Sequence, residues 1–275
     1  MRIVHTIAEL RAALGGAGPI NLVPTMGNLH GGHLSLVDVA RLRPGVLVTS
    51  IFVNRLQFGP QEDFSRYPRT LDSDCRLLDS AGCDIVFAPS DGEMYPQEQE
   101  YRLVPPAAIA DVFEGAVRPG FFIGVCTVVL KLFHIVRPDA AFFGKKDYQQ
   151  LMIIRRMALQ LALPTEIIGC ETVRDGNGLA LSSRNGYLSA AELAEAPELG
   201  RVLRKVAMDI RVGGVAWPDL ERGAMQSLRS RHWQPDYIAV RRRADLGVAE
   251  PKDPLIVIGA ARLGGTRLID NYEVP

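Results

Sequence analysis

Short apolar runs alternate with helical patterns over the first 170 residues of the chain. The runs at 20–25 and 46–53 are nearly continuous, which is typical of parallel strands covered on both faces. The segments 6–14 and 70–82 instead space their apolar residues as amphipathic helices do. Strands that alternate with helices predict an α/β fold with a Rossmann-like, doubly wound parallel sheet.

The pattern changes after residue 173. The segment 174–188, "RDGNGLALSSRNGYL", is rich in glycine and polar residues, so we interpret it as a hinge or linker. Ser189 and Glu192 form a capping box, and the helix it begins is expected to run to about Gly213. Two β-like segments follow, and the second reads as a hairpin turning at its Gly-Gly pair. We therefore predict a domain at 1–173 and a smaller α+β domain at 189–275.

Charge and cysteine content narrow the classes of protein. The 275 residues carry 31 basic and 31 acidic side chains and have no net charge, which argues against a nucleic-acid binder. The four cysteines are scattered without a Cys-x-x-Cys pair, so neither a disulfide framework nor a zinc site is expected. Neither a signal-peptide pattern nor an apolar run of 18 residues is present. We expect a cytoplasmic protein with no membrane partner.

The stretch "PTMGNLHGGHLSLV" at 24–37 places His30 and His33 where a predicted strand turns into a helix that is expected to begin at His33. In an open parallel sheet, ligands bind at the carboxyl ends of strands. A helix start offers N–H groups and partial positive charge to a phosphate. Glycines at 27, 31 and 32 allow a close approach of the backbone. Two imidazoles there could donate hydrogen bonds to phosphate oxygens as charge builds up in a transition state.

Two other interpretations of the histidines stay open at this point. They could cap and pack the helix without any chemical role, or a spacing of three could place both rings on a metal ion. Neither of the common nucleotide-binding glycine motifs competes with this site. The chain contains no G-x-x-x-x-G-K-[ST], and no G-x-G-x-x-G follows a strand.

Five motifs occur in one order along the chain and extend the picture beyond the histidines. They are "PTMGNLHGGHLSLV", "SIFVNRLQF", "YPRTLDSD", "FFGKKDYQQL" and "GLALSSRNGYL". The first contains "HGGH", which resembles the H-x-G-H signature of the nucleotidyl-transferring α/β superfamily. Together the five motifs resemble the pantoate–β-alanine ligases, also called pantothenate synthetases, over nearly the whole chain.

That resemblance implies an ATP- and Mg²⁺-dependent enzyme. Ligases of this family activate pantoate as an acyl adenylate, releasing pyrophosphate, and β-alanine then displaces AMP to give pantothenate. The protein's task in adenylation is to neutralise phosphate charge and to align the attack. The resemblance also implies a homodimer, with residues 1–173 binding ATP and pantoate and the C-terminal domain acting as a lid.

The resemblance assigns roles by position in this sequence. The residues expected to act in catalysis are His30, His33, Lys146, Ser182 and Arg184. Those expected to contact ATP are Pro24, Thr25, Met26, His33, Gly144, Lys146, Asp147, Val173, Ser182, Ser183 and Arg184. Those expected to bind pantoate are Asn54, Gln57 and Gln150, and the candidate near magnesium is Asp74. On the residues alone, Lys146 could be solvated and Asp147 could merely cap a helix.

The chain departs from the family pattern at five positions. Arg55 replaces a proline, Ser73 an acidic residue, Phe121 a histidine, Ile123 an arginine and Lys145 a glutamate. Some of these residues border the segments expected to form the substrate pocket. They keep open a second hypothesis, a related amide-forming ligase that uses the same adenylate chemistry on a different acid or amine.

Overall fold

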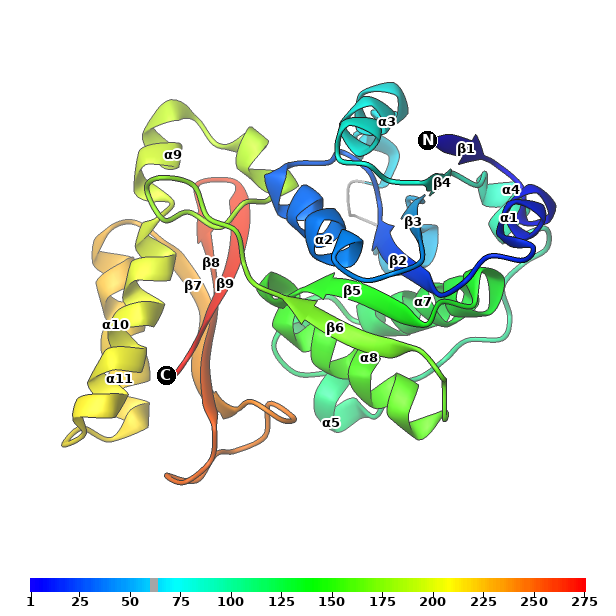
Figure 1. The fold of residues 1–275 in the computed structure, drawn as a ribbon. Helices are drawn as coiled ribbons and strands as arrows, with labels where there is room; N and C mark the ends of the chain where they lie inside the picture. Colours follow the sequence, from blue (N-terminus) through cyan, green and yellow to red (C-terminus); the bar gives the residue numbers. More distant parts are fainter. Residues whose placement is uncertain (60–63) are drawn as a thin grey trace. The chain divides into compact units, whose positions relative to one another are not determined.

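The chain forms two compact units, each described here by itself (Figure 1). The computed structural model describes residues 1–59 and 64–275. The first unit contains residues 1–145 and 150–171, and the second contains residues 146–149 and 172–275. The predicted fold class is confirmed, since the first unit has a six-stranded parallel sheet and the second a separate three-stranded sheet with helices. Residues 146–149, expected in the first domain, group with the second unit.

The parallel sheet of the first unit has the strand order β1-β4-β3-β2-β5-β6. Its strands are β1 (Arg2–Val4), β2 (Ile20–Thr25), β3 (Val46–Ile51), β4 (Ile85–Phe87), β5 (Ala140–Gly144) and β6 (Glu166–Cys170). The chain runs outward in one direction from β2 through β3 to β4, and in the other from β5 to β6. The order therefore reverses between β2 and β5, which pair directly. Such a reversal is where open α/β sheets bind ligands.

Helices cover both faces of this sheet, which explains its nearly continuous apolar strands. The helices are α1 (Ile7–Leu14), α2 (Gly31–Arg41), α3 (Leu71–Ser80), α4 (Asp91–Met94), α5 (Ala107–Ala110), α6 (Glu114–Val117), α7 (Phe121–Val136) and α8 (Tyr148–Gln160), with 3-10 turns η1 (Arg55–Gln57), η2 (Phe64–Arg66) and η3 (Lys145–Asp147). Helix α2 packs on β2, β3 and β5, where Val23 and Phe142 join Val37 in one core. Strand side chains alternate, so Leu22 and Ala141, also fully buried, face the other side.

The second unit builds its own core on an antiparallel sheet. Its elements are η4 (Ser183–Tyr187), α9 (Ala190–Glu195), α10 (Glu198–Val212), α11 (Trp217–Ser230), β7 (Gln234–Arg242), β8 (Leu255–Leu263) and β9 (Thr266–Glu273). Strand β8 lies between β7 and β9. Helix α10 packs on β8 and β9, and α11 packs on β7 and α10. Leu203 and Leu228 are fully buried between these helices and the sheet.

Three elements differ from the sequence-based expectation. The helix expected from Ser189 to Gly213 is two helices, since Pro197 lacks the N–H that would continue the hydrogen bonding of α9. Helix α11, which has Pro218 in its first turn, was not predicted. Helix α2 begins at Gly31 rather than His33. Among the described residues, none of the helices combines the length and the apolar character needed to cross a membrane.

Candidate functional site

The candidate site of the first unit begins at the point where the strand order reverses. Strand β2 ends at Thr25, residues 26–30 form a turn, and α2 starts at Gly31. The neighbouring strand β5 ends at Gly144, which Lys145 follows. The carboxyl ends of both strands and the N-terminus of α2 thus lie at one edge of the sheet, where backbone N–H groups favour an anion.

His30 and His33 form the cap of helix α2. Nδ1 of His30 accepts a hydrogen bond from the N–H of Gly32 at 3.1 Å, and Nδ1 of His33 accepts one from the N–H of His30 at 3.3 Å. This is a capping box made of two imidazoles, and it satisfies two N–H groups of the helix start. The rings lie with centroids 4.1 Å apart. Both histidines therefore cap the helix as one interpretation of the sequence predicted, and they use their Nδ1 atoms to do so.

The cap also decides which ring nitrogen can donate. Because Nδ1 accepts in both rings, the proton of each neutral imidazole lies on Nε2. Each ring is thus held in one tautomer and one orientation, with an Nε2–H as its donor. Capping and hydrogen-bond donation use opposite edges of the ring, so the two roles are compatible.

Asp74 holds the turn that leads into this cap. Its carboxylate accepts from the N–H of Asn28 at 2.9 Å, the N–H of Leu29 at 2.8 Å and the Oγ1–H of Thr70 at 3.0 Å. Gly27 has φ of 81°, and a Cβ there would lie 3.0 Å from the Asp74 carboxylate. The glycine is therefore needed both for the backbone conformation and for the close approach.

These contacts do not fit the magnesium role expected for Asp74. Its side chain is 1% exposed, and both oxygens already accept hydrogen bonds from the protein. A protein-bound Mg²⁺ needs carboxylate oxygens together with several waters. Within residues 1–59 and 64–275, no group of three or more histidine, cysteine or acidic side chains could hold a metal ion, which also removes the two histidines as part of such a centre. Asp74 instead shapes the turn.

A second cluster of the first unit surrounds Gln57. Nδ2 of Asn54 donates to Oε1 of Gln57 at 3.1 Å and to the carbonyl oxygen of Gly124 at 3.2 Å. Nε2 of Gln57 lies 3.0 Å from Sδ of Met26. The contact with Asn54 fixes the Gln57 amide with its oxygen toward Asn54 and its NH₂ toward Met26, beside the end of β2.

Tyr95 completes this cluster and was not predicted from the sequence. Its O–H donates to Oδ1 of Asn54 at 2.7 Å, and Asn54 is 1% exposed. Burial, aided by the nearby Asp91 carboxylate, raises the pKa of Tyr95 well above its usual range, so the hydroxyl stays protonated as a donor. Local sequence around Tyr95 gives no signal for this role, because the contact spans 41 positions.

The remaining candidates of the first unit lie at the ends of strands β2 and β5 and at the start of helix α8. Pro24 and Thr25 end β2, and Oγ1 of Thr25 donates to the carbonyl oxygen of Ser50 at 2.8 Å. Gly144 ends β5. Gln150 lies in the first turn of α8, and within the described part of the chain no hydrogen bond joins it to Gln57.

The candidates of the second unit lie on two segments. Lys146 and Asp147 close the 3-10 turn η3. Val173 accepts from the N–H of Leu181 at 3.0 Å, which closes the loop before Ser182. Ser182 caps η4 by accepting from the N–H of Arg184 at 3.3 Å, and Ser183 is the first residue of that turn. Arg184 itself is exposed.

Comparisons with known proteins cover the whole chain. The family model for pantoate–β-alanine ligase matches residues 2–273. The pantothenate synthetase of Leptothrix cholodnii is 58% identical over 285 aligned residues, which cover 99% of this chain and all of that protein. The resemblance inferred from the five motifs is thereby confirmed.

Solved structures agree with this result. A pantothenate synthetase from Thermus thermophilus superposes with a TM-score of 0.94 at 46% identity, covering 100% of this chain and 99% of that one. The pantoate–β-alanine ligase of Francisella tularensis, crystallised with beta-gamma ATP and β-alanine, has a TM-score of 0.80 at 32% identity, covering 99% and 97%. The chain belongs to the pantoate–β-alanine ligase family.

Proposed function

We propose that this ligase joins pantoate to β-alanine through a pantoyl adenylate. A carboxylate oxygen of pantoate attacks the α-phosphorus of ATP, and pyrophosphate leaves. The amine of β-alanine then attacks the acyl carbon, AMP leaves, and pantothenate is formed. A carboxylate is a poor electrophile until its oxygen becomes a good leaving group, and AMP supplies that group.

The observation that carries the proposal is the pair of imidazoles tied down through Nδ1 at the start of α2. Their Nε2–H groups are preoriented donors, so little reorganisation is needed when negative charge grows on the phosphates during adenylation. The N-terminus of α2 adds partial positive charge at the same edge of the sheet. We assign His30 and His33 to the triphosphate on this ground.

The other nucleotide contacts are proposed from the motifs that carry the family resemblance. Lys146, Ser182 and Arg184 would neutralise the phosphates, and Asp147 would hold the ribose. The remaining ATP contacts would come from Pro24, Thr25, Met26, Gly144, Val173 and Ser183.

Pantoate is proposed to bind beside Met26. The Gln57 amide presents its NH₂ group there because Asn54 holds its oxygen, so it is ready to donate to a hydroxyl or carboxylate. Gln150 is the third proposed group, on the basis of the family motif alone.

Magnesium is proposed only as a companion of ATP. Asp74 is 1% exposed and both its oxygens already accept hydrogen bonds from the protein, so no residue of this chain is assigned to the ion and no step is derived through it. A homodimer in the cytoplasm remains an expectation from the family. The dimer can be checked by light scattering of the purified chain.

Isotope exchange between pyrophosphate and ATP tests the adenylate. We expect exchange that depends on pantoate without β-alanine, and AMP release only when β-alanine is added. Exchange with some other carboxylic acid and none with pantoate would instead favour the related ligase with a changed substrate. ATP binding without any exchange would refute both.

A further inference from the structure

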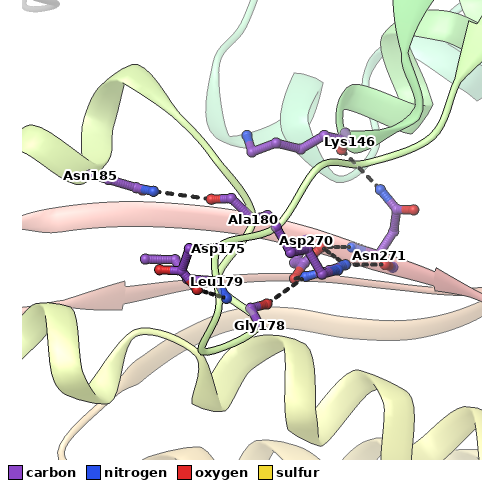
Figure 2. A network of polar contacts seen from close by, with 9 residues as sticks. Lys146, Asp175, Gly178, Leu179, Ala180, Asn185, Asp270 and Asn271 are labelled. Atoms are coloured by element: carbon purple, nitrogen blue, oxygen red, sulfur yellow. Dashed lines mark hydrogen bonds and ion pairs between the residues drawn. The ribbon is translucent and has the colours of Figure 1, made fainter. Parts of the chain in front are cut away.

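The main chain of Lys146 is held by strand β9 of the second unit. Nδ2 of Asn271 donates to the carbonyl oxygen of Lys146 at 2.9 Å, as Figure 2 shows. Two residues later, the O–H of Tyr148 donates to the carbonyl oxygen of Arg243 at 3.2 Å. These contacts give a physical reason why residues 146–149 group with the second unit.

The residue before Asn271 fastens the other segment. Asp270, buried at 6% exposure, pairs with both Nη atoms of Arg174 at 2.7 and 2.8 Å (Figure 2). Arg174 also donates to the carbonyl oxygen of Gly178 at 3.1 Å. A Cβ on Gly200 of α10 would lie 2.8 Å from the Asp270 carboxylate, so the glycine makes room for the pair.

The loop that this ion pair holds leads along the chain to Ser182. Arg174 pairs with Ala180 as an isolated β-bridge. Nδ2 of Asn185 donates to the carbonyl oxygen of Ala180 at 3.0 Å, which connects the loop with η4. The segment that carries Ser182 and Arg184 is thus connected to β9 by consecutive polar contacts.

Alternation along β9 explains how one strand serves both segments. Leu268 and Tyr272 pack with the helix-covered core of the second unit, and Asp270 shares their face. Asn271 therefore points to the opposite face, toward Lys146. The lysine side chain is long and flexible, so holding its backbone is a direct way to limit where its ammonium can go.

We propose that Asn271 is a positioning residue for Lys146, and that the adjacent Asp270–Arg174 pair fixes the Ser182 segment to the same strand. Strand β9 then presents both phosphate-binding segments of the second unit as one rigid body. The inference rests on the proposed function, in which Lys146 neutralises phosphate charge.

Asn271→Ala tests the inference because it removes the donor to Lys146 but leaves the lysine itself. We expect kcat of the pantoate-dependent exchange to fall ten- to a hundredfold, since a displacement of about 1 Å can cost 10²-fold. KM for pantoate should stay within twofold. Asn271→Asp, close to the same size but without the donor, should give the same result if the alanine variant folds poorly.

A double-variant cycle separates positioning from general damage. If Asn271 acts through Lys146, Asn271→Ala should have less than a twofold further effect in a Lys146→Ala background. Equal losses in both backgrounds would overturn the inference. Wild-type exchange in Lys146→Ala would instead refute the proposed role of the lysine. Asp236→Asn, which removes the negative charge from the ion pair with Arg267 elsewhere on this sheet (2.6 Å), is the matched control and should keep wild-type kinetics.

Labelling of lysines gives a readout that does not need turnover. The chain has five lysines, so modification of Lys146 by an amine reagent can be followed by mass spectrometry. We expect ATP to protect Lys146 in the wild type and to protect it at least fivefold less in Asn271→Ala. Equal protection in both proteins would count against positioning.

Discussion

Replacing His30 by asparagine separates the two roles of this ring. Asparagine is among the best N-cap residues, and its Oδ1 can accept from the N–H of Gly32 as Nδ1 of His30 does at 3.1 Å. It has no group at the place of Nε2. His30→Asn should therefore keep the cap and lose the donor to phosphate, whereas His30→Ala loses both.

The expected magnitudes differ enough to be told apart. Loss of a helix cap costs about 0.5–2 kcal/mol of stability, which is roughly 2–4 °C in Tm per kcal/mol for a chain near this size. Loss of a hydrogen-bond donor to transition-state charge costs about 2.7–4 kcal/mol, or about 10²–10³ in kcat. We expect His30→Asn to melt like the wild type and His30→Ala to melt lower, with both losing about 10²–10³ in exchange.

Thermal melting and pantoate-dependent pyrophosphate exchange measure the two effects separately. At position 33, glutamine is the informative substitution, since its Oε1 can reach back to the N-cap N–H as in other capping boxes. His33→Gln should therefore protect stability better than His33→Ala. Near-wild-type exchange in His30→Asn, with a lowered Tm only in His30→Ala, would show that the ring is a cap and would refute the assigned chemistry.

Three further substitutions test the surroundings of the site. Tyr95→Phe removes one hydrogen bond to Asn54, worth about 0.5–1.5 kcal/mol. KM for pantoate should therefore rise about two- to tenfold while KM for ATP stays unchanged. Equal changes in both KM values would argue against an effect through Asn54. Asp74→Asn should lower Tm, because the charge-assisted hydrogen bonds from three donors are lost. The Mg²⁺ concentration that gives half-maximal exchange should stay unchanged, and a shift of that concentration would support the magnesium role of Asp74. Lys145→Ala removes an ion pair with the exposed Glu171, worth about 0–1 kcal/mol, so activity and Tm should barely change. A large loss of exchange would instead place Lys145 in the phosphate site.

Elements with a local signal were predictable from the sequence. Strands β2 and β3 are buried on both faces, so their apolar runs are short and nearly unbroken. The capping boxes at Thr6 and Ser189 are formed as their three-residue spacing indicates. Helix α11 was not predicted, although its apolar positions at 217, 220, 224 and 228 have the three- and four-residue spacing of an amphipathic helix, so in this case the local signal was present.

Contacts between distant positions left no such signal. The Asp74 carboxylate holds a backbone N–H 46 positions earlier, and Asn271 holds a carbonyl group 125 positions earlier. In both cases the partner is a main-chain atom, which every residue possesses. The identity of the partner residue therefore gives no indication that the contact exists. The positioning residues of a site are for that reason harder to predict than the motifs they support.

The structure shows which contacts the residues that depart from the family pattern make. Arg55 pairs with Asp91 at 3.1 Å, and its guanidinium lies 5.2 Å from the Tyr95 ring. The Lys145 ammonium pairs with Glu171. Both new cations thus have an acidic partner within the first unit, and Ser73 donates to the carbonyl oxygen of Thr70 at 2.9 Å in the first turn of α3.

Phe121 is the departure that bears on the pocket. The Arg118 guanidinium lies 3.7 Å from the centroid of its ring and donates to the carbonyl oxygen of Gln57 at 3.1 Å. An aromatic face attracts a guanidinium, so the ring supports an arginine that holds the backbone of Gln57, while nothing in the structure explains Ile123. The loss of a histidine at position 121 is therefore accompanied by a contact that stabilises the Gln57 segment. The Phe121 ring therefore supports the backbone of Gln57, the residue that is proposed to bind pantoate.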